Sequence, residues 1–209
     1  MTLAAPSAEA APTGLAPLLL PPDLMLTPVQ FAQVCEANPE AVLELAADGR
    51  LITMTPAGGS TGRRNARLTT LLQNWSDRQG GWCVFDSSTG FQLSDGSVLS
   101  PDVSVVRLDR WQALSPEQQR RFPPLCPDLV IELASPSDEG PRGAKALRRK
   151  MATYRANGAR LGWLLLPETR DVEVWSKGRD PERLVDQAVL EGEPLLPGLR
   201  LELAELWAA

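Results

Sequence analysis

Two carboxylates in apolar surroundings are the side chains of this sequence whose type and position could do chemistry. Glu132 lies inside the apolar run Leu129–Leu133, and Asp102 follows Pro101 at the start of a second apolar run. A buried carboxylate is stable only when it is protonated, paired or bound to a cation. Two carboxylates on adjacent strands repel each other unless a cation lies between them. An exposed edge-strand position for Glu132 and a turn cap for Asp102 are the alternatives.

The chemistry that such a pair favours is metal-assisted hydrolysis. The sequence contains no histidine, so histidine ligands and histidine acid–base catalysis are excluded. Oxygen ligands alone favour Mg²⁺ or Mn²⁺. Such an ion polarises a phosphoryl oxygen and lowers the pKa of a bound water. We therefore predict phosphodiester hydrolysis, with Asp102 and Glu132 as metal ligands.

Lys150 and Glu44 are the next candidates. Lys150 lies on a predicted helix after the Glu132 strand, with Tyr154 one turn later on the same face. Its ammonium could orient or deprotonate the attacking water, or stabilise charge in the transition state, and a solvated basic face is the alternative. Glu44 is a second carboxylate in an apolar strand, just before Asp48-Gly49, and exposure on a hairpin is its alternative.

The composition indicates a chain that can fold around a core of its own. Of its 209 residues, 43% are hydrophobic and 22% charged, and the net charge of −5 argues against non-specific coating of nucleic acid. The three cysteines show no C-x-x-C spacing, which argues against zinc and a disulfide framework and suits a reducing cytoplasm. No run reaches the roughly 18 apolar residues of a membrane span, so we expect no membrane partner.

The order of the predicted elements indicates an α/β or α+β fold, with a mixed sheet flanked by helices and an N-terminal hairpin. We expect an Ala/Pro-rich arm over residues 1–22 and one domain over residues 23–209. The predicted helices are 27–37, 61–78, 111–121 and 144–157. The predicted strands are 42–45, 50–54, 82–85, 90–93, 98–99, 101–106, 128–133, 161–166 and 172–175.

Four runs in a fixed order resemble a known family. They are LELAADGRLITMTPAGG, SPDVSVV, CPDLVIELASPSD and KMATYRANGARLGWLLLPETRDVEVW, and together the match spans roughly residues 27–207. This order is similar to that of the Uma-two-type family of restriction endonucleases, which belongs to the PD-(D/E)XK nuclease superfamily. The resemblance implies a restriction-endonuclease-like fold, a Mg²⁺-dependent or Mn²⁺-dependent endonuclease activity on DNA, and a homodimer.

The resemblance also implies roles for individual residues. Asp102 would match the aspartate of the PD motif, Glu132 the acidic residue of (D/E)XK, and Glu44 the acidic residue ahead of the first turn. A main-chain carbonyl near Leu133 would complete the metal site. The sequence departs from the motif two positions after Glu132, where alanine replaces lysine. The resemblance suggests that Lys150 supplies this amine from the following helix.

Three functions stay open at this point. The first is an endonuclease with catalytic residues Glu44, Asp102, Glu132 and Lys150. The second is a non-catalytic DNA-binding or protein-interaction module on the same fold, which the missing strand lysine favours. The third is a sugar or metabolite hydrolase in which Glu44 and Glu132 form an acid–base pair. Three arginines begin the second helix and could contact phosphate, and a solvated face is the alternative for them: Arg63, Arg64 and Arg67.

Overall fold

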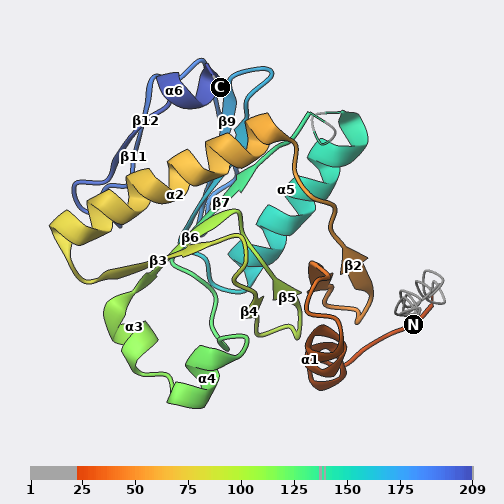
Figure 1. Ribbon diagram of the computed structural model, residues 1–209. Coiled ribbons are helices and arrows are strands. Elements are labelled where there is room, and N and C mark those ends of the chain that lie inside the picture. The colour runs from red at the N-terminus through yellow and green to blue at the C-terminus, as the bar shows by residue number, and fades with distance from the viewer. Residues whose placement is uncertain (1–22, 137, 139, 209) are drawn as a thin grey trace, which may run out of the picture.

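The computed structural model describes residues 23–136, 138 and 140–208. A six-stranded mixed sheet lies at the centre of the fold (Figure 1). The arm predicted for residues 1–22 lies outside the described residues. The six strands of this sheet run in the order β10-β9-β8-β7-β6-β3, and within it only β7 and β8 pair in parallel. In the same order, the bounds of the strands are β10 Glu182–Val185, β9 Asp171–Ser176, β8 Leu161–Leu166, β7 Leu129–Leu133, β6 Val103–Arg107 and β3 Trp82–Asp86.

Two smaller sheets complete the strand structure. The order of the four-stranded sheet is β2-β1-β5-β4, and it contains the predicted hairpin. A two-stranded sheet pairs β11 with β12 near the C-terminus. The bounds of these strands are β1 Leu43–Leu45, β2 Leu51–Thr53, β4 Phe91–Gln92, β5 Val98–Leu99, β11 Val189–Glu191 and β12 Arg200–Glu202.

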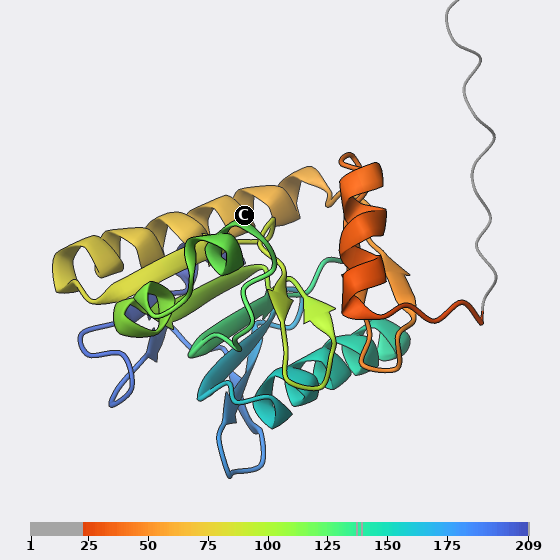
Figure 2. The same ribbon diagram turned by 90° about the horizontal axis from the view of Figure 1, so that it is seen from below.

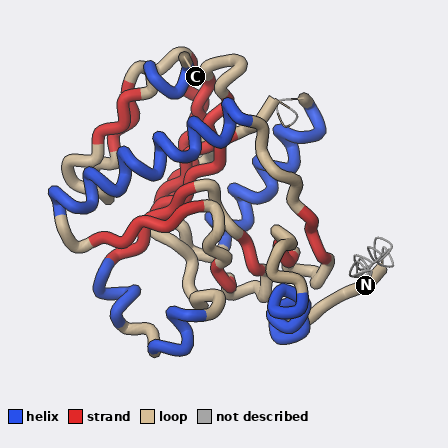
Figure 3. Tube along the Cα trace, in the orientation of Figure 1, coloured by secondary structure: helices blue, strands red, loops and turns tan. Residues whose placement is uncertain are grey.

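The two long helices, α2 Gly59–Gln79 and α5 Pro141–Ala156, cover opposite faces of the large sheet, which gives three layers (Figure 2). The small sheet with β1 and β2, together with α1, lies to one side of these layers (Figures 1 and 3). The helices are α1 Pro28–Ala37, α2 Gly59–Gln79, α3 Leu108–Gln112, α4 Pro116–Arg120, α5 Pro141–Ala156 and α6 Ala204–Trp207. Among the described residues, no helix is both long and apolar enough to cross a bilayer.

The buried side chains of β7 alternate between the two faces of the sheet. Ile131 belongs to the core that α2 covers with Leu68 and Leu72, whereas Val130 belongs to the core that α5 covers with Met151. Successive side chains of a strand point to opposite faces. Position 132 therefore faces α5, the helix that carries Lys150.

Local sequence signals explain where several elements begin and end. Thr27 caps α1 in a capping box with Gln30, and Pro28 occupies the first turn. Gly49 forms the hairpin turn at φ +85°, a conformation that costs an L-residue with a β-carbon about 1–2 kcal/mol. Gly80 ends α2 with φ +70°. The hairpin and both long helices are thus confirmed in type and place.

The predictions fail where the chain makes short or late elements. The helix predicted over 111–121 is two short helices, because Ser115 caps a new helix at Pro116. The second predicted helix begins two residues earlier than expected, at Gly59. The strands β10 and β11 were not predicted, because β10 is mostly exposed and the three residues of β11 are too few to show an apolar alternation.

Candidate functional site

The ammonium of Lys150 is the centre of the candidate site. Its Nζ lies 2.8 Å from Glu44 Oε1 and 3.0 Å from Glu132 Oε1. The same Nζ donates a hydrogen bond of 2.9 Å to the carbonyl oxygen of Ser100. Three protein oxygens therefore surround the ammonium, although Glu132 Oε1 lies at ion-pair distance without making a hydrogen bond.

Three separate elements bring these side chains together. Glu132 comes from the central strand β7, Lys150 from the inner side of α5, and Glu44 from β1 of the small sheet. The exposed fraction is 3% for Glu44 and 2% for Glu132. These values exclude the exposed alternatives that the sequence left open for both glutamates.

The backbone of Ser100 connects this cluster to Asp102. The Ser100 N–H donates to Glu44 Oε1 at 2.8 Å, and the Ser100 carbonyl accepts from Lys150. Only Pro101 separates Ser100 from Asp102. Glu44 and Lys150 therefore fix the segment that delivers Asp102 to the end of the sheet.

Asp102 lies at the start of β6, beside the end of β7. Its Oδ2 accepts a hydrogen bond of 2.8 Å from the Leu133 N–H, and its Oδ1 accepts one of 2.9 Å from Asn65 Nδ2 on α2. The antiparallel pairing of Val103 with Ile131 confirms that the Asp102 and Glu132 strands are neighbours. Asp102 thus lies at the end of the sheet, where it contacts both α2 and the backbone of the strand that carries Glu132.

Burial and crowding of negative charge shift the pKa values in the cluster. Burial, together with the charges of Asp102 and Glu44, raises the pKa of Glu132 to about 8 although Lys150 opposes this shift. Burial likewise raises the pKa of Asp102, despite the Leu133 N–H bond and the Lys150 charge. The charges of Glu132 and Glu44 outweigh the burial of Lys150 and raise its pKa. Lys150 is therefore a cation across the physiological pH range.

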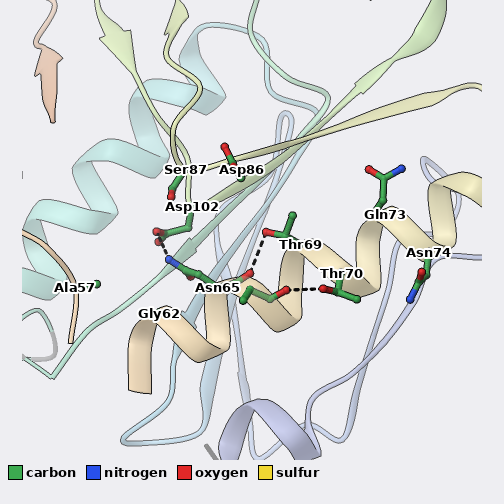
Figure 4. A pocket seen from close by; sticks show the side chains of 11 residues that line it. Ala57, Gly62, Asn65, Thr69, Thr70, Gln73, Asn74, Asp86, Ser87 and Asp102 are labelled. Atoms are coloured by element: carbon green, nitrogen blue, oxygen red, sulfur yellow. Dashed lines mark hydrogen bonds between the residues drawn. The ribbon is translucent and has the colours of Figure 1, made fainter. Parts of the chain in front are cut away.

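A cavity of about 600 Å³ opens beside Asp102 on the α2 side of the sheet (Figure 4). One wall is α2, and the other contains Asp86 and Ser87 at the end of β3. Of the predicted site residues, Asp102 alone is among those that line this cavity in the described structure. Its other lining residues are Ala57, Gly62, Asn65, Ala66, Thr69, Thr70, Gln73 and Asn74.

The donor set fits a hard divalent cation with few protein ligands. No group of three His, Cys, Asp or Glu side chains among the described residues is arranged to hold a metal ion. Asp102 and Glu132 offer oxygen donors, and burial is the main cause of their raised pKa values, which a bound cation would oppose by favouring the ionised forms. Mg²⁺ is commonly held by one or two carboxylates, with waters and substrate phosphates as its other ligands.

The structure brings together most, but not all, of the residues that the sequence singled out. Glu44, Glu132 and Lys150 meet directly, and Asp102 joins them through Ser100. Asn65, the partner of Asp102, was missed, because an asparagine on the polar side of a helix resembles any solvated residue.

The basic residues at the start of α2 do not act together. Arg64 donates to the Leu206 carbonyl at 2.8 Å, and Arg67 lies 2.6 Å from Glu205. Arg64 is buried against the C-terminal helix α6, and Arg67 makes a partly exposed ion pair with it. Arg63 is exposed.

Comparison with known proteins gives the family and the fold. The family model Uma2, described as "Putative restriction endonuclease", matches residues 28–204. The crystal structure of a "putative nuclease belonging to DUF820" from Anabaena variabilis matches with a TM-score of 0.72 and 18% identity, covering 88% of this chain and 98% of that chain. At this identity the structural match shows the fold. No match was found among curated proteins.

Proposed function

Because the chain belongs to the Uma2 restriction endonuclease family, we propose that it is a metal-dependent endonuclease that hydrolyses phosphodiester bonds of DNA. Family and fold together support a nuclease-like function. The observation that carries the proposal further is the 3.0 Å contact between Lys150 Nζ and Glu132 Oε1. It supports the idea that α5 supplies the amine that Ala134 cannot supply from β7.

Each polar residue has a proposed task in this reaction. Asp102 and Glu132 would hold Mg²⁺ or Mn²⁺ together with the Leu133 carbonyl, and the ion would polarise the phosphoryl oxygen and activate water. Lys150 stabilises negative charge on the phosphate as a permanent cation, because its raised pKa makes it a poor base. Glu44 holds Lys150 and the Ser100 backbone in position.

Cleavage assays test the proposal directly. Linear and supercoiled DNA are incubated with the protein in Mg²⁺, in Mn²⁺ and in EDTA, and the products are separated by electrophoresis. We expect cleavage with either ion and none in EDTA. The variants Asp102→Asn and Glu132→Gln should lose at least 100-fold in rate, on the scale of losing a group that stabilises the transition state. Lys145→Met, on the exposed side of α5, is the matched control for Lys150→Met.

One observation favours a second function, a DNA-binding module without catalysis. Three protein oxygens lie within 3.0 Å of the Lys150 ammonium, so a phosphate must displace at least one of these contacts before it can approach the ammonium closely. DNA binding without cleavage under every divalent ion tested would support this module and overturn the endonuclease. The Glu44 and Glu132 acid–base pair has less support, since both carboxylates face one ammonium.

The homodimer and the cytoplasmic location stay predictions. Light scattering on the purified chain measures its mass in solution, and two chains per particle would support the homodimer. Localisation of a fluorescent fusion tests the cytoplasmic setting. Neither outcome changes the assignment of the four polar side chains.

A further inference from the structure

We infer that the cavity beside Asp102 is a subsite for the uncharged part of a nucleotide, the base or sugar of an unpaired strand. This inference rests on the proposed function and names the form of nucleic acid that the same site accepts.

A row of side chains on one side of α2 lines the cavity: Asn65, Thr69 and Gln73. These residues are spaced four apart, so their side chains follow one line along the helix. Figure 4 shows Thr69 and Gln73 rising from the same side of α2, whereas Asn74 turns to the other side. From Asn65 to Gln73 the row is roughly 12 Å long, at about 1.5 Å per residue. At the roughly 3.4 Å per nucleotide of a DNA strand, that length spans a few nucleotides.

Asn65 connects the row to the reaction centre. Its Nδ2 donates to Asp102 Oδ1 at 2.9 Å. A nucleotide that lies along the row would therefore have its neighbouring phosphate beside Asp102. The row begins at the proposed metal ligand and leads away from it.

The hydrogen bonds within the row leave acceptor groups for a ligand. The Thr69 hydroxyl donates to the Asn65 carbonyl at 2.9 Å, so its oxygen keeps lone pairs. Gln73 Nε2 donates to Asp77 Oδ1 at 2.7 Å, which fixes the amide and leaves Oε1 as an acceptor. Base amino and imino groups and sugar hydroxyls are the nucleotide donors that such acceptors fit.

The charge around the cavity argues against a phosphate-binding role for the row. Its lining in the described structure includes two carboxylates, Asp86 and Asp102, and no lysine or arginine. Phosphate contacts depend on cationic or N–H donors. The uncharged face of a nucleotide enters this cavity without charge repulsion, so the backbone must lie away from the row.

An unpaired strand fits this arrangement better than a duplex. In a duplex the Watson–Crick edges are used in pairing, and the charged backbones flank both grooves. A single strand can turn its base edges toward α2 and its phosphates toward solvent. The preference for unpaired nucleic acid is therefore part of the inference.

Binding measurements with a salt titration test the subsite. The full chain is titrated into labelled 12-nucleotide single strands and the matching duplex, in EDTA to prevent hydrolysis and again with Ca²⁺. The variants are Thr69→Val and Gln73→Ala, and Gln33→Ala removes an exposed amide on α1 as the matched control. Thermal unfolding confirms that each variant is folded.

The expected result has three parts. The single strand binds more tightly than the duplex, and each row variant weakens single-strand binding about 5- to 10-fold, while the control does not. The slope of log affinity against log salt stays unchanged, because no phosphate contact is removed. A slope that falls by about 0.7 per variant, equal affinity for the duplex, or unchanged binding by both row variants would each overturn the subsite.

The test separates the subsite from the proposed function. Cleavage that persists with unchanged binding in Thr69→Val and Gln73→Ala overturns the subsite and leaves the endonuclease in place. Absence of both binding and cleavage in the unmodified chain overturns both. Weakened single-strand binding by the row variants without cleavage supports the subsite on a module that has lost its chemistry.

Discussion

Lys150 Nζ lies 3.0 Å from Glu132 Oε1, although the two residues belong to different elements, α5 and β7. An amine two residues after Glu132 on the same strand would point to the same face of the sheet. A side chain from α5 reaches the same face, because α5 packs on it. An amine can therefore lie beside Glu132 whether it comes from the strand or from the helix. The contact also makes Lys150 and its two glutamates energetically dependent on each other.

Removing the Lys150 charge should destabilise the fold strongly. Lys150→Met leaves the buried Glu44 carboxylate without its cation, and breaking a buried ion pair from one side costs about 3–5 kcal/mol. Urea denaturation measures this loss as a lower free energy of unfolding. Lys145→Met, on the exposed side of α5, should change that free energy by less than about 0.5 kcal/mol.

Neutralising both carboxylates in the same protein separates charge from packing. The triple variant Glu44→Gln, Glu132→Gln, Lys150→Met removes the unpaired charges, so it should be more stable than Lys150→Met alone. Equal stability of the single and triple variants would show that the cost comes from lost packing of the lysine stem. In that case the ion pairs contribute little to the fold.

Asp102→Asn should separate metal binding from stability. Asparagine keeps an oxygen that accepts the Leu133 N–H bond. Its new amide group can donate to Asn65, whose Oδ1 has no hydrogen-bond partner in the described structure, once the Asn65 amide turns over. The free energy of unfolding should therefore change by less than about 1 kcal/mol, because both hydrogen bonds are kept. The affinity for Mg²⁺ should fall by at least tenfold, because a charged ligand is lost.

Asp102→Ala is the contrasting variant for this pair of measurements. It leaves the Leu133 N–H without its acceptor, which costs about 1–3 kcal/mol. Calorimetric titration with Mg²⁺ and thermal unfolding give both quantities for each variant. Unchanged Mg²⁺ affinity in Asp102→Asn would contradict the assignment of Asp102 as a metal ligand.

The central part of the site could be predicted from the sequence, because charged side chains stand there among apolar ones. A carboxylate inside an apolar strand is rare enough to draw attention to Glu132, and the strand of Asp102 was correctly expected beside it. The type of each long element followed from helical or alternating periodicity. These signals are local, so they are present in one sequence.

The remaining features depend on contacts between distant segments. Glu44 lies on a short hairpin strand, and its burial depends on how the small sheet packs, which no local pattern encodes. Asn65 acquires its role only because α2 crosses the end of β6. Arg64 and Arg67 contact α6, which follows them by about 140 residues in the sequence, so no local pattern reveals these contacts. Partners from other elements decide such roles.

The raised pKa of Glu132 predicts how stability depends on pH. Burial raises the pKa of this carboxyl in the folded protein to about 8, against an ordinary value of 4.5. Between these pH values the folded state binds more protons, so rising pH lowers stability by at most about 1.4 kcal/mol per pH unit from this group. The glutamine of Glu132→Gln cannot titrate. As pH rises through this window, the free energy of unfolding of this variant should therefore increase relative to that of the unmodified chain.

Urea denaturation of both proteins at several pH values measures this difference. Glu182→Gln, an exposed glutamate on β10, is the control and should show no such trend. A constant difference between Glu132→Gln and the unmodified chain would mean that Glu132 is ionised in the folded protein throughout the range. The Lys150 ammonium would then stabilise the carboxylate form more strongly than burial opposes it.

Two glycines near the site should respond to alanine with opposite signs. Gly49 has φ +85°, and a β-carbon there would lie 2.8 Å from the Leu26 carbonyl oxygen. Gly49→Ala should therefore lower the free energy of unfolding by about 2 kcal/mol or more, because backbone strain adds to the steric clash. Gly59, the first residue of α2, has open space around its β-carbon position, so Gly59→Ala should raise stability by about 0.4–1 kcal/mol. Thermal unfolding of both variants gives the two signs. A Gly49→Ala protein as stable as the unmodified chain would show that the hairpin turn of β1 and β2 adopts another conformation, and the position of Glu44 beside Lys150 would have to be reconsidered with it.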